Sequence, residues 1–268
     1  NLGYMHKNGQ GVVQDYKQAV SWFQKAAEQG DLDAQTSLGY MHKNGQGVTQ
    51  DYKQGAAWYR KAAEQGHATA QTNFGYMYYQ GQGVTQDDKQ AVAWYRKAAE
   101  QGHVRAQFNL GYMYQHGEGV TQDDKQAIAW YRKAAEQGDE HAQFNLGYMY
   151  HHGEGVAQDD KQAIAWYRKA AEQGYVRAQF NLGYMYHHGE GAAQNDKQAV
   201  AWYRKAAEQG HEDAQFNLGL MYENSQGAEQ ADANTQFTPN AGTVFTVSIL
   251  VILPGLFLLI HFKRKKKV

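Results

Sequence analysis

A period of 36 residues constrains this chain more than any other feature of its sequence. All six tryptophans, from Trp22 to Trp202, recur at that interval, and so does a column of seven glycines from Gly3 to Gly219. Residues 145–180 differ from residues 109–144 at only five positions. A fixed period of this length is typical of a solenoid, in which each unit buries its apolar surface against its neighbours. The sequence therefore predicts a repeat array over residues 1–227 rather than a domain with one central core.

Each period contains two segments with helical spacing of apolar residues. In residues 104–117, Ala106, Leu110 and Met113 fall at positions i, i+4 and i+7, which places them on one face of a helix. Residues 123–138 carry a similar stripe of alanine, tryptophan and tyrosine, and a glycine-containing loop joins the two segments. The predicted fold is an all-α solenoid of about six antiparallel helix–turn–helix repeats, followed by one C-terminal transmembrane helix.

The second helix of each period carries capping signals at both ends. Asp123 and Gln126 have the spacing of a capping box, and Gly138 falls where a left-handed glycine ends many helices. Where the two helices cross, we expect Gly111 to lie against Ala134 or Ala135, because glycine lets another backbone come close.

The residues that recur most strictly carry a family resemblance. The runs "AWYRKAAEQG" at 129–138 and "AQFNLGYMY" at 142–150 resemble the Sel-one-like repeat, a relative of the tetratricopeptide repeat. The resemblance covers nearly all of residues 1–227 and implies a scaffold or adaptor that binds other proteins. Some bacterial relatives have a cysteine pair in each repeat, whereas this chain has no cysteine, so a disulfide-stapled form is not supported.

The charge of the array argues against nucleic acid as a partner. Without the five basic residues at 263–267, the chain has 21 basic and 27 acidic residues. Nucleic-acid binding draws most of its affinity from basic side chains that neutralise phosphates. We therefore expect proteins, and not nucleic acid, to bind the repeats.

The end of the chain has a different composition. Residues 228–242 lose the period and read as a polar linker, whereas Thr243–Phe262 has no charged residue over 20 positions, enough for a helix to cross a membrane. The basic tail at 263–268 should remain cytoplasmic, which predicts a single-pass protein with an extracytoplasmic array in a bacterial envelope. Two alternatives remain: a cytoplasmic tail-anchored array, or a C-terminal sorting segment that is cleaved.

The sequence does not indicate a catalytic, metal or cofactor site. Histidine and glutamate in the loops could form a ladder of metal ligands, but equivalent atoms of adjacent repeats should lie about 8–10 Å apart. No serine precedes a lysine at the spacing of penicillin-recognising enzymes, and the paired carboxylates at helix starts suit capping. The loop residues considered as metal ligands are His116, His152, His188, Glu118, Glu154 and Glu190.

Positions that vary between otherwise similar repeats are the natural candidates for partner binding. The triplet that begins the first helix of each period varies most, and the first helices of such solenoids line the concave face. The alternative interpretation is that these triplets are exposed helix starts under little constraint. The residues predicted to bind a partner are Arg105, Tyr114, His141, Tyr150, Tyr175, Arg177, Tyr186 and His211.

These observations together predict a membrane-anchored scaffold without catalytic activity. The alternative functions are an envelope enzyme or cell-wall-fragment binder that uses the concave groove, and a cytoplasmic tail-anchored adaptor. An enzyme would need a cluster of acidic, basic or metal-binding groups that breaks the repeat symmetry.

Overall fold

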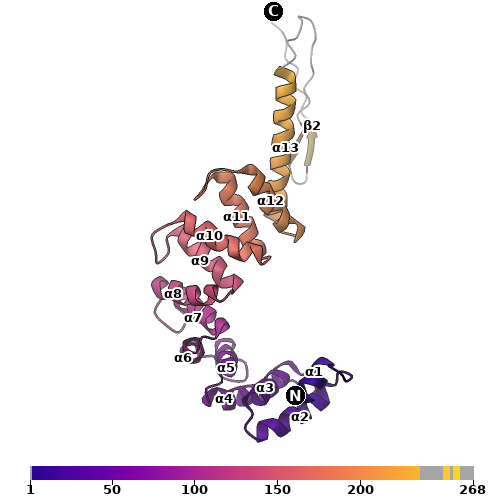
Figure 1. Cartoon of the computed structure of the whole chain (residues 1–268), viewed down its shortest axis with the longest axis vertical. Helices are drawn as coiled ribbons and strands as arrows, with labels where there is room; N and C mark the ends of the chain where they lie inside the picture. Colours follow the sequence, from indigo (N-terminus) through magenta and orange to yellow (C-terminus); the bar gives the residue numbers. More distant parts are fainter. Residues whose placement is uncertain (1, 236–249, 254–255, 260–268) are drawn as a thin grey trace, which may run out of the picture. The chain divides into compact units, whose positions relative to one another are not determined.

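The computed structural model describes residues 2–235, 250–253 and 256–259. It contains two compact units, Asn1–Leu218 and Gly219–Val268, which are described separately. The helices are α1 Leu2–Asn8, α2 Tyr16–Glu28, α3 Leu32–Asn44, α4 Tyr52–Glu64, α5 Ala68–Gln80, α6 Asp88–Glu100, α7 Val104–His116, α8 Asp124–Glu136, α9 Glu140–His152, α10 Asp160–Glu172, α11 Val176–His188, α12 Asp196–Glu208 and α13 Glu212–Thr235 (Figure 1).

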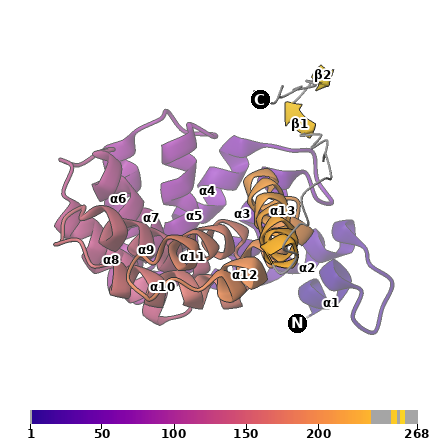
Figure 2. The ribbon, with the colours of Figure 1, turned by 90° about the horizontal axis from the view of Figure 1, so that it is seen from above.

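The first unit is a stack of helical hairpins. Each odd-numbered helix from α1 to α11 pairs with the even-numbered helix that follows it, and each even-numbered helix from α2 to α10 also packs against the next odd-numbered one. Figure 2 shows that the hairpins follow a curved path, with α3, α5, α7, α9 and α11 on its inner side. This arrangement confirms the predicted α-solenoid.

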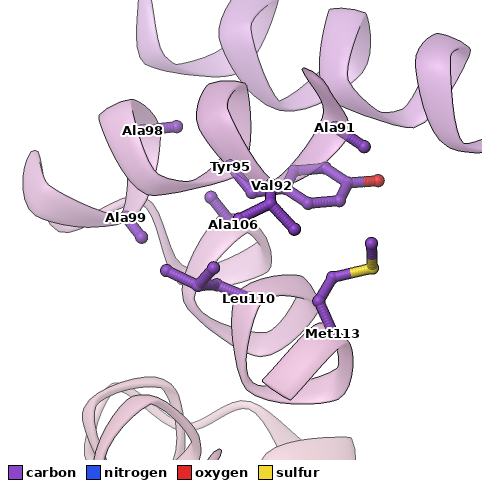
Figure 3. Close-up of a cluster of buried hydrophobic side chains, with 8 residues drawn as sticks. All are labelled: Ala91, Val92, Tyr95, Ala98, Ala99, Ala106, Leu110 and Met113. Carbon is purple, nitrogen blue, oxygen red and sulfur yellow. The ribbon is translucent and has the colours of Figure 1, made fainter. Parts of the chain in front are cut away.

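The apolar core is divided into clusters that join one hairpin to the next. In Figure 3, side chains from α6 and α7, which belong to successive hairpins, point toward one another. Trp130 of α8 packs against the edge of this cluster, so a third helix helps to cover it. No repeat buries its apolar face alone, as expected for a solenoid. The buried residues of this cluster are Ala91, Val92, Tyr95, Ala98, Ala99, Ala106, Leu110 and Met113.

In each hairpin from α3–α4 to α11–α12, a glycine of the first helix faces a tyrosine ring of the second, whereas in α1–α2 it faces Phe23. A Cβ atom at Gly111 of α7 would lie 2.7 Å from Cδ1 of Tyr131 in α8, and Tyr131 is fully buried. The prediction that Gly111 lies against Ala134 or Ala135 is therefore wrong. The missing side chain makes room for an aromatic ring, which fills the space between the two helices.

The predicted N-cap at Asp123 and the left-handed cap at Gly138 are confirmed, whereas the reciprocal half of the capping box is replaced by a bond to α7. The Asp123 carboxylate accepts a hydrogen bond from the Gln126 backbone N–H at 3.0 Å. The N–H of Asp123 itself donates to the Tyr114 carbonyl oxygen at 2.9 Å, so the cap also ties α8 to the end of α7. At the other end Gly138, with φ of 95°, and Asp139 donate to the carbonyl oxygens of Ala135 and Ala134, which is a Schellman motif.

The loop between the two helices of a hairpin also contacts the preceding hairpin. Gly119 has φ of 67°, and a side chain there would overlap the Asp88 carbonyl group at the start of α6. Equivalent glycines meet the equivalent backbone in other repeats, so these G-x-G loops are inter-repeat contacts.

The C-terminal region differs from its prediction where it is described. The predicted linker at 228–242 begins as helix, because α13 continues to Thr235 through a run rich in alanine, glutamate and glutamine, which favour helices. The rest of that linker and the basic tail at 263–268 lie outside the described residues.

The predicted transmembrane helix at Thr243–Phe262 is only partly described. Within it, β1 Leu250–Leu253 and β2 Leu256–Leu259 pair antiparallel, with Leu250 opposite Leu259, instead of forming a helix. The proline and glycine between them are typical of a turn in sequence. Among the helices of the described residues, none is both long and apolar enough to cross a membrane.

The glycine–tyrosine contact predicts that Gly111→Ala lowers the free energy of unfolding by about 1–3 kcal/mol, because the added methyl group overlaps the Tyr131 ring. Gly219→Ala is the matched control: Gly219 occupies the same repeat position within α13, but a Cβ atom there would meet no atom of the described residues within 4 Å. Its substitution should be neutral or stabilising by about 0.5–1 kcal/mol. Urea denaturation of both variants measures the difference, and equal effects would contradict the assigned contact.

Candidate functional site on the inner face

Buried glutamines fix the start of each inner helix. Gln143 of α9 is 4% exposed, and its Nε2 donates to the Ala135 carbonyl oxygen at the end of α8 at 3.1 Å. Its Oε1 accepts a hydrogen bond of 2.8 Å from Nε2 of Gln173, the C-cap residue of α10. Gln173 also donates to the Gly138 carbonyl oxygen at 3.0 Å. One amide thus joins the ends of two outer helices to the inner helix between them.

The same relay recurs along the array. Gln35, Gln71, Gln107 and Gln179 are buried in the same way, and each donates to a carbonyl oxygen eight residues earlier. Because a buried amide without partners is costly, this column has little freedom to vary. The inner helices therefore begin at defined positions relative to one another.

The variable helix starts contact each other from repeat to repeat. In the first repeats the contacts are polar: His67 Nε2 lies 3.1 Å from Asp33 Oδ1, and His67 Nδ1 lies 2.9 Å from Thr36 Oγ1. His103 contacts Thr72 in the same way, at 3.0 Å. Burial lowers the pKa of His103, as do the nearby charges of Arg105 and His67.

In later repeats the same contacts are aromatic. Phenylalanine replaces threonine at this position, and the Tyr175 ring lies 5.1 Å from those of both Phe144 and His141. The His211 ring stacks on Phe180 at 4.5 Å. The residue at each helix start therefore varies together with the threonine or phenylalanine that it contacts in the preceding repeat.

Two hollows lie side by side on the inner side of α7, α9 and α11. The first has a volume of about 470 Å³ and is lined mainly by α9 and α11, including Tyr148, Arg177 and Tyr184. The second has a volume of about 590 Å³ and is lined mainly by α7 and α9, with Tyr112 and Gln115. Phe144, Tyr148 and Arg177 line both hollows, so the two form one groove, which we call the inner groove. Aromatic rings with a cation are typical of anchoring positions in protein interfaces.

The predicted partner-binding tyrosines lie away from this groove. Tyr150 and Tyr186 are buried at 8% and 4% exposure, and their hydroxyl groups accept hydrogen bonds from Arg132 and Arg168 of the preceding outer helices. Tyr114 is half-buried and accepts the equivalent bond from Arg96 at 2.7 Å. These tyrosines hold successive hairpins together, and their role as anchors for a partner stays a prediction.

The other residues predicted to bind a partner lie in the inner groove or at the starts of the inner helices. Arg177 and His211 line the inner groove, and the Arg177 guanidinium lies 4.6 Å from the centre of the Phe144 ring. His141 is exposed and Tyr175 half-buried, in the row of paired helix starts. Arg105 is exposed, and its charge adds to burial in lowering the pKa of Lys43.

The loop histidines do not form a metal site in the described residues, where no group of three or more potential ligands converges. His116, His152 and His188 instead lie 4.2 Å from the tyrosine rings one turn earlier on their own helices. The neighbouring histidines contact carboxylates: His151 Nδ1 lies 2.8 Å from Asp160 Oδ1, and His187 Nδ1 lies 3.0 Å from Asp196 Oδ1.

Sequence reasoning missed Phe144, Tyr148, Phe180 and Tyr184, which line the groove. The two tyrosines recur in nearly every repeat, and strict recurrence indicates packing and binding equally well. The phenylalanines could have been found from their variation between repeats, because threonine occupies their position in the first two complete repeats.

Stacked helical hairpins without a strand between residues 2 and 218 define this protein as an α-solenoid of the tetratricopeptide-like class. The Sel1 repeat profile matches seven consecutive segments, so the chain belongs to the Sel1 repeat family. Members of this family are typically protein-interaction scaffolds, and their solenoid is typically non-catalytic. The matched segments are residues 1–31, 32–67, 68–103, 104–139, 140–175, 176–211 and 212–235.

Two solved structures are similar over most of the chain. One is a protective antigen present in uropathogenic Escherichia coli strains, with 45% identity and a TM-score of 0.76 over 84% of this chain. This chain spans only 48% of that protein. The other is a Sel1 repeat protein from Oxalobacter formigenes, with 36% identity and a TM-score of 0.73 over 83% of this chain and 87% of that one. Among curated proteins, none matches the sequence significantly.

The glutamine relay predicts that Gln143→Met lowers the free energy of unfolding by about 1–3 kcal/mol, because the Ala135 carbonyl and the Gln173 amide lose their buried partner. Gln215→Met is the matched control, since Gln215 occupies the same position but is exposed. Thermal and urea unfolding should show a clearly smaller loss for the control. Equal losses would mean that the relay is not a significant source of stability.

Proposed function

We propose that this protein is a non-catalytic scaffold that binds a partner protein in the inner groove. The observation that carries the proposal is the continuous lining of Phe144, Tyr148 and Arg177 between the two hollows. Rigid rings next to a guanidinium provide apolar area and a directional donor at low entropic cost, which is typical of residues that dominate binding energy. The Sel1 family, whose members are typically interaction scaffolds, supports the same function.

The stack of repeats suits this role. Glutamine relays, glycine–tyrosine contacts and helix caps fix the backbone at every repeat, so groove side chains are presented by a rigid support. Binding by a preorganised surface avoids part of the entropic cost of association. A partner with an extended segment could contact several repeats at once.

A photocrosslinking amino acid tests this function in the native cell. Placed at Tyr148, which lines both hollows, it should join the protein to a discrete partner. Placed at the exposed Ala129 of the outer helix α8, it should give little of that product. Equal products from both positions, or none from either, would contradict binding in the inner groove.

The scaffold is further proposed to be tethered to a membrane by Thr243–Phe262, with the array outside the cytoplasm of a bacterial cell. Support comes from the sequence alone: 20 residues without a charge followed by a basic cluster.

Membrane attachment predicts that the full chain resists extraction by alkaline carbonate, because an apolar span stays in the bilayer. A variant that ends after Gly242 is the control and should be released into the supernatant. Protease added to intact spheroplasts should digest the array if it lies outside the cytoplasm. Release of the full chain by carbonate would disprove the tether, and protection from protease would place the array inside.

A further inference from the structure

Two buried tyrosine hydroxyls of the outer helices, those of Tyr167 and Tyr203, lack a hydrogen-bond partner among the described residues, and of the two only Tyr167 lines the inner groove. Tyr167 of α10 is 1% exposed, lines the first hollow, and its hydroxyl has no hydrogen-bond partner of standard geometry among the described residues. Burial raises the pKa of Tyr167, and the Asn181 side chain and the Arg177 charge offset this only in part. Its O–H group therefore remains a neutral donor that needs an acceptor.

The equivalent tyrosine one repeat earlier does have an acceptor. Tyr131 donates to Gln115 Oε1 at 2.9 Å. In the next repeat His151 replaces Gln115, and its ring is engaged elsewhere, with Nδ1 2.8 Å from Asp160 and Nε2 3.8 Å from Glu190. The residue at this position differs between repeats, and where it is histidine, at 151 and 187, the following buried tyrosine has no internal acceptor among the described residues. Tyr167 in addition lines a hollow large enough for a ligand.

The groups around this donor indicate the chemistry of the missing acceptor. Arg177 holds a guanidinium at the hollow, and its charge reaches the Tyr167 hydroxyl. Three histidines line the same hollow, and Asp213 is the one carboxylate in its lining as described. Asp160, whose charge also reaches Tyr167, lies 2.8 Å from His151 Nδ1. Phe144 and Phe180 supply apolar walls. An anionic acceptor next to an apolar group fits this set better than a neutral or cationic one.

We propose that the first hollow binds the carboxylate of an acidic residue in an extended segment of the partner protein, held by Tyr167 and Arg177. This inference rests on the proposed scaffold function and adds the chemistry of the segment that is recognised. Tyr167 donates to one carboxylate oxygen, Arg177 pairs with the anion, and the aromatic walls take the neighbouring apolar side chain. The second hollow should lack this preference, because Tyr131 is not part of its lining as described and already donates to Gln115, and because Asp124 and Glu154 line it.

The test uses two pools of fluorescein-labelled, C-terminally amidated octapeptides that differ only in having glutamate or glutamine at the fourth position. The other positions are random mixtures of uncharged residues. Fluorescence polarisation with the full chain should show about tenfold tighter binding of the glutamate pool, as expected for charge-assisted hydrogen bonds. Equal binding of the two pools, or binding of neither, would overturn the proposal.

Two conservative variants assign the preference to the hydroxyl group. Tyr167→Phe should remove most of the preference for glutamate, while Tyr131→Phe, the matched control, should keep it although it breaks the bond to Gln115. Circular dichroism and thermal unfolding confirm that both variants fold. An unchanged preference in Tyr167→Phe, or an equal loss in Tyr131→Phe, would show that the hydroxyl does not recognise the carboxylate.

Two further measurements distinguish a carboxylate on a peptide from a free small acid, and the carboxylate site from the scaffold function on which it rests. Acetate at the concentration of the peptides should not displace the glutamate pool, and full displacement would assign the hollow to small acids instead. Crosslinking from Tyr148 is independent of this preference, because that residue lines both hollows. Crosslinking to a partner without a preference for glutamate would refute only the carboxylate site, whereas failure of crosslinking would refute the scaffold.

Discussion

The hydrogen bonds of one buried side-chain amide fix the position and angle of each repeat relative to the next. Gln143 joins the ends of α8 and α10 to the start of α9, and both of its polar atoms are satisfied in a site almost closed to water. Apolar packing is tolerant of small shifts, whereas an amide that bonds to two groups fixes distance and direction together. Small errors in the angle between hairpins would accumulate along a solenoid. A directional contact repeated in each unit limits them and gives the inner face its regular geometry.

This rigidity divides the positions of each repeat into two kinds. The fixed kind includes the glutamines, the glycine that faces a tyrosine ring, and the loop glycine that meets the preceding helix start. At positions of the other kind, the residue changes together with its neighbour in the next repeat. Thr36 and Thr72 contact histidines, whereas Phe144 and Phe180 pack against aromatic rings. Variation at the helix starts is therefore constrained by the neighbouring repeat. Phe144 and Arg177 take part in this pairing and also line the inner groove, so the same contacts that join the repeats position groove side chains.

The sequence predicted the hairpins and caps because those depend on contacts within one period. Asp123 and Gly138 act on backbone groups a few residues away, so their roles could be inferred from spacing alone. The partner of Gly111 could not, since a helical stripe defines a face but not which residue of the other helix meets it. Tyr150 and Tyr186 looked like surface residues because the arginines that cover them come from the preceding outer helix. Helix α13 extends beyond the period because local helix propensity, and not the repeat, determines where it ends.

The inner groove illustrates how a duplicated sequence can acquire a specific site with few changes. The position that holds Gln115 in one repeat holds a histidine in the next two, His151 and His187. Exchange of Gln115 for His151 removes an internal acceptor, because the imidazole turns to Asp160 and Glu190 and no longer accepts from the buried tyrosine. The backbone is unaffected, since the glutamine relay and the Gly147–Tyr167 contact remain in place. A donor without a partner costs some stability in the free protein. A ligand that supplies the acceptor regains that free energy on binding, so the loss of an internal hydrogen bond becomes selectivity for a partner.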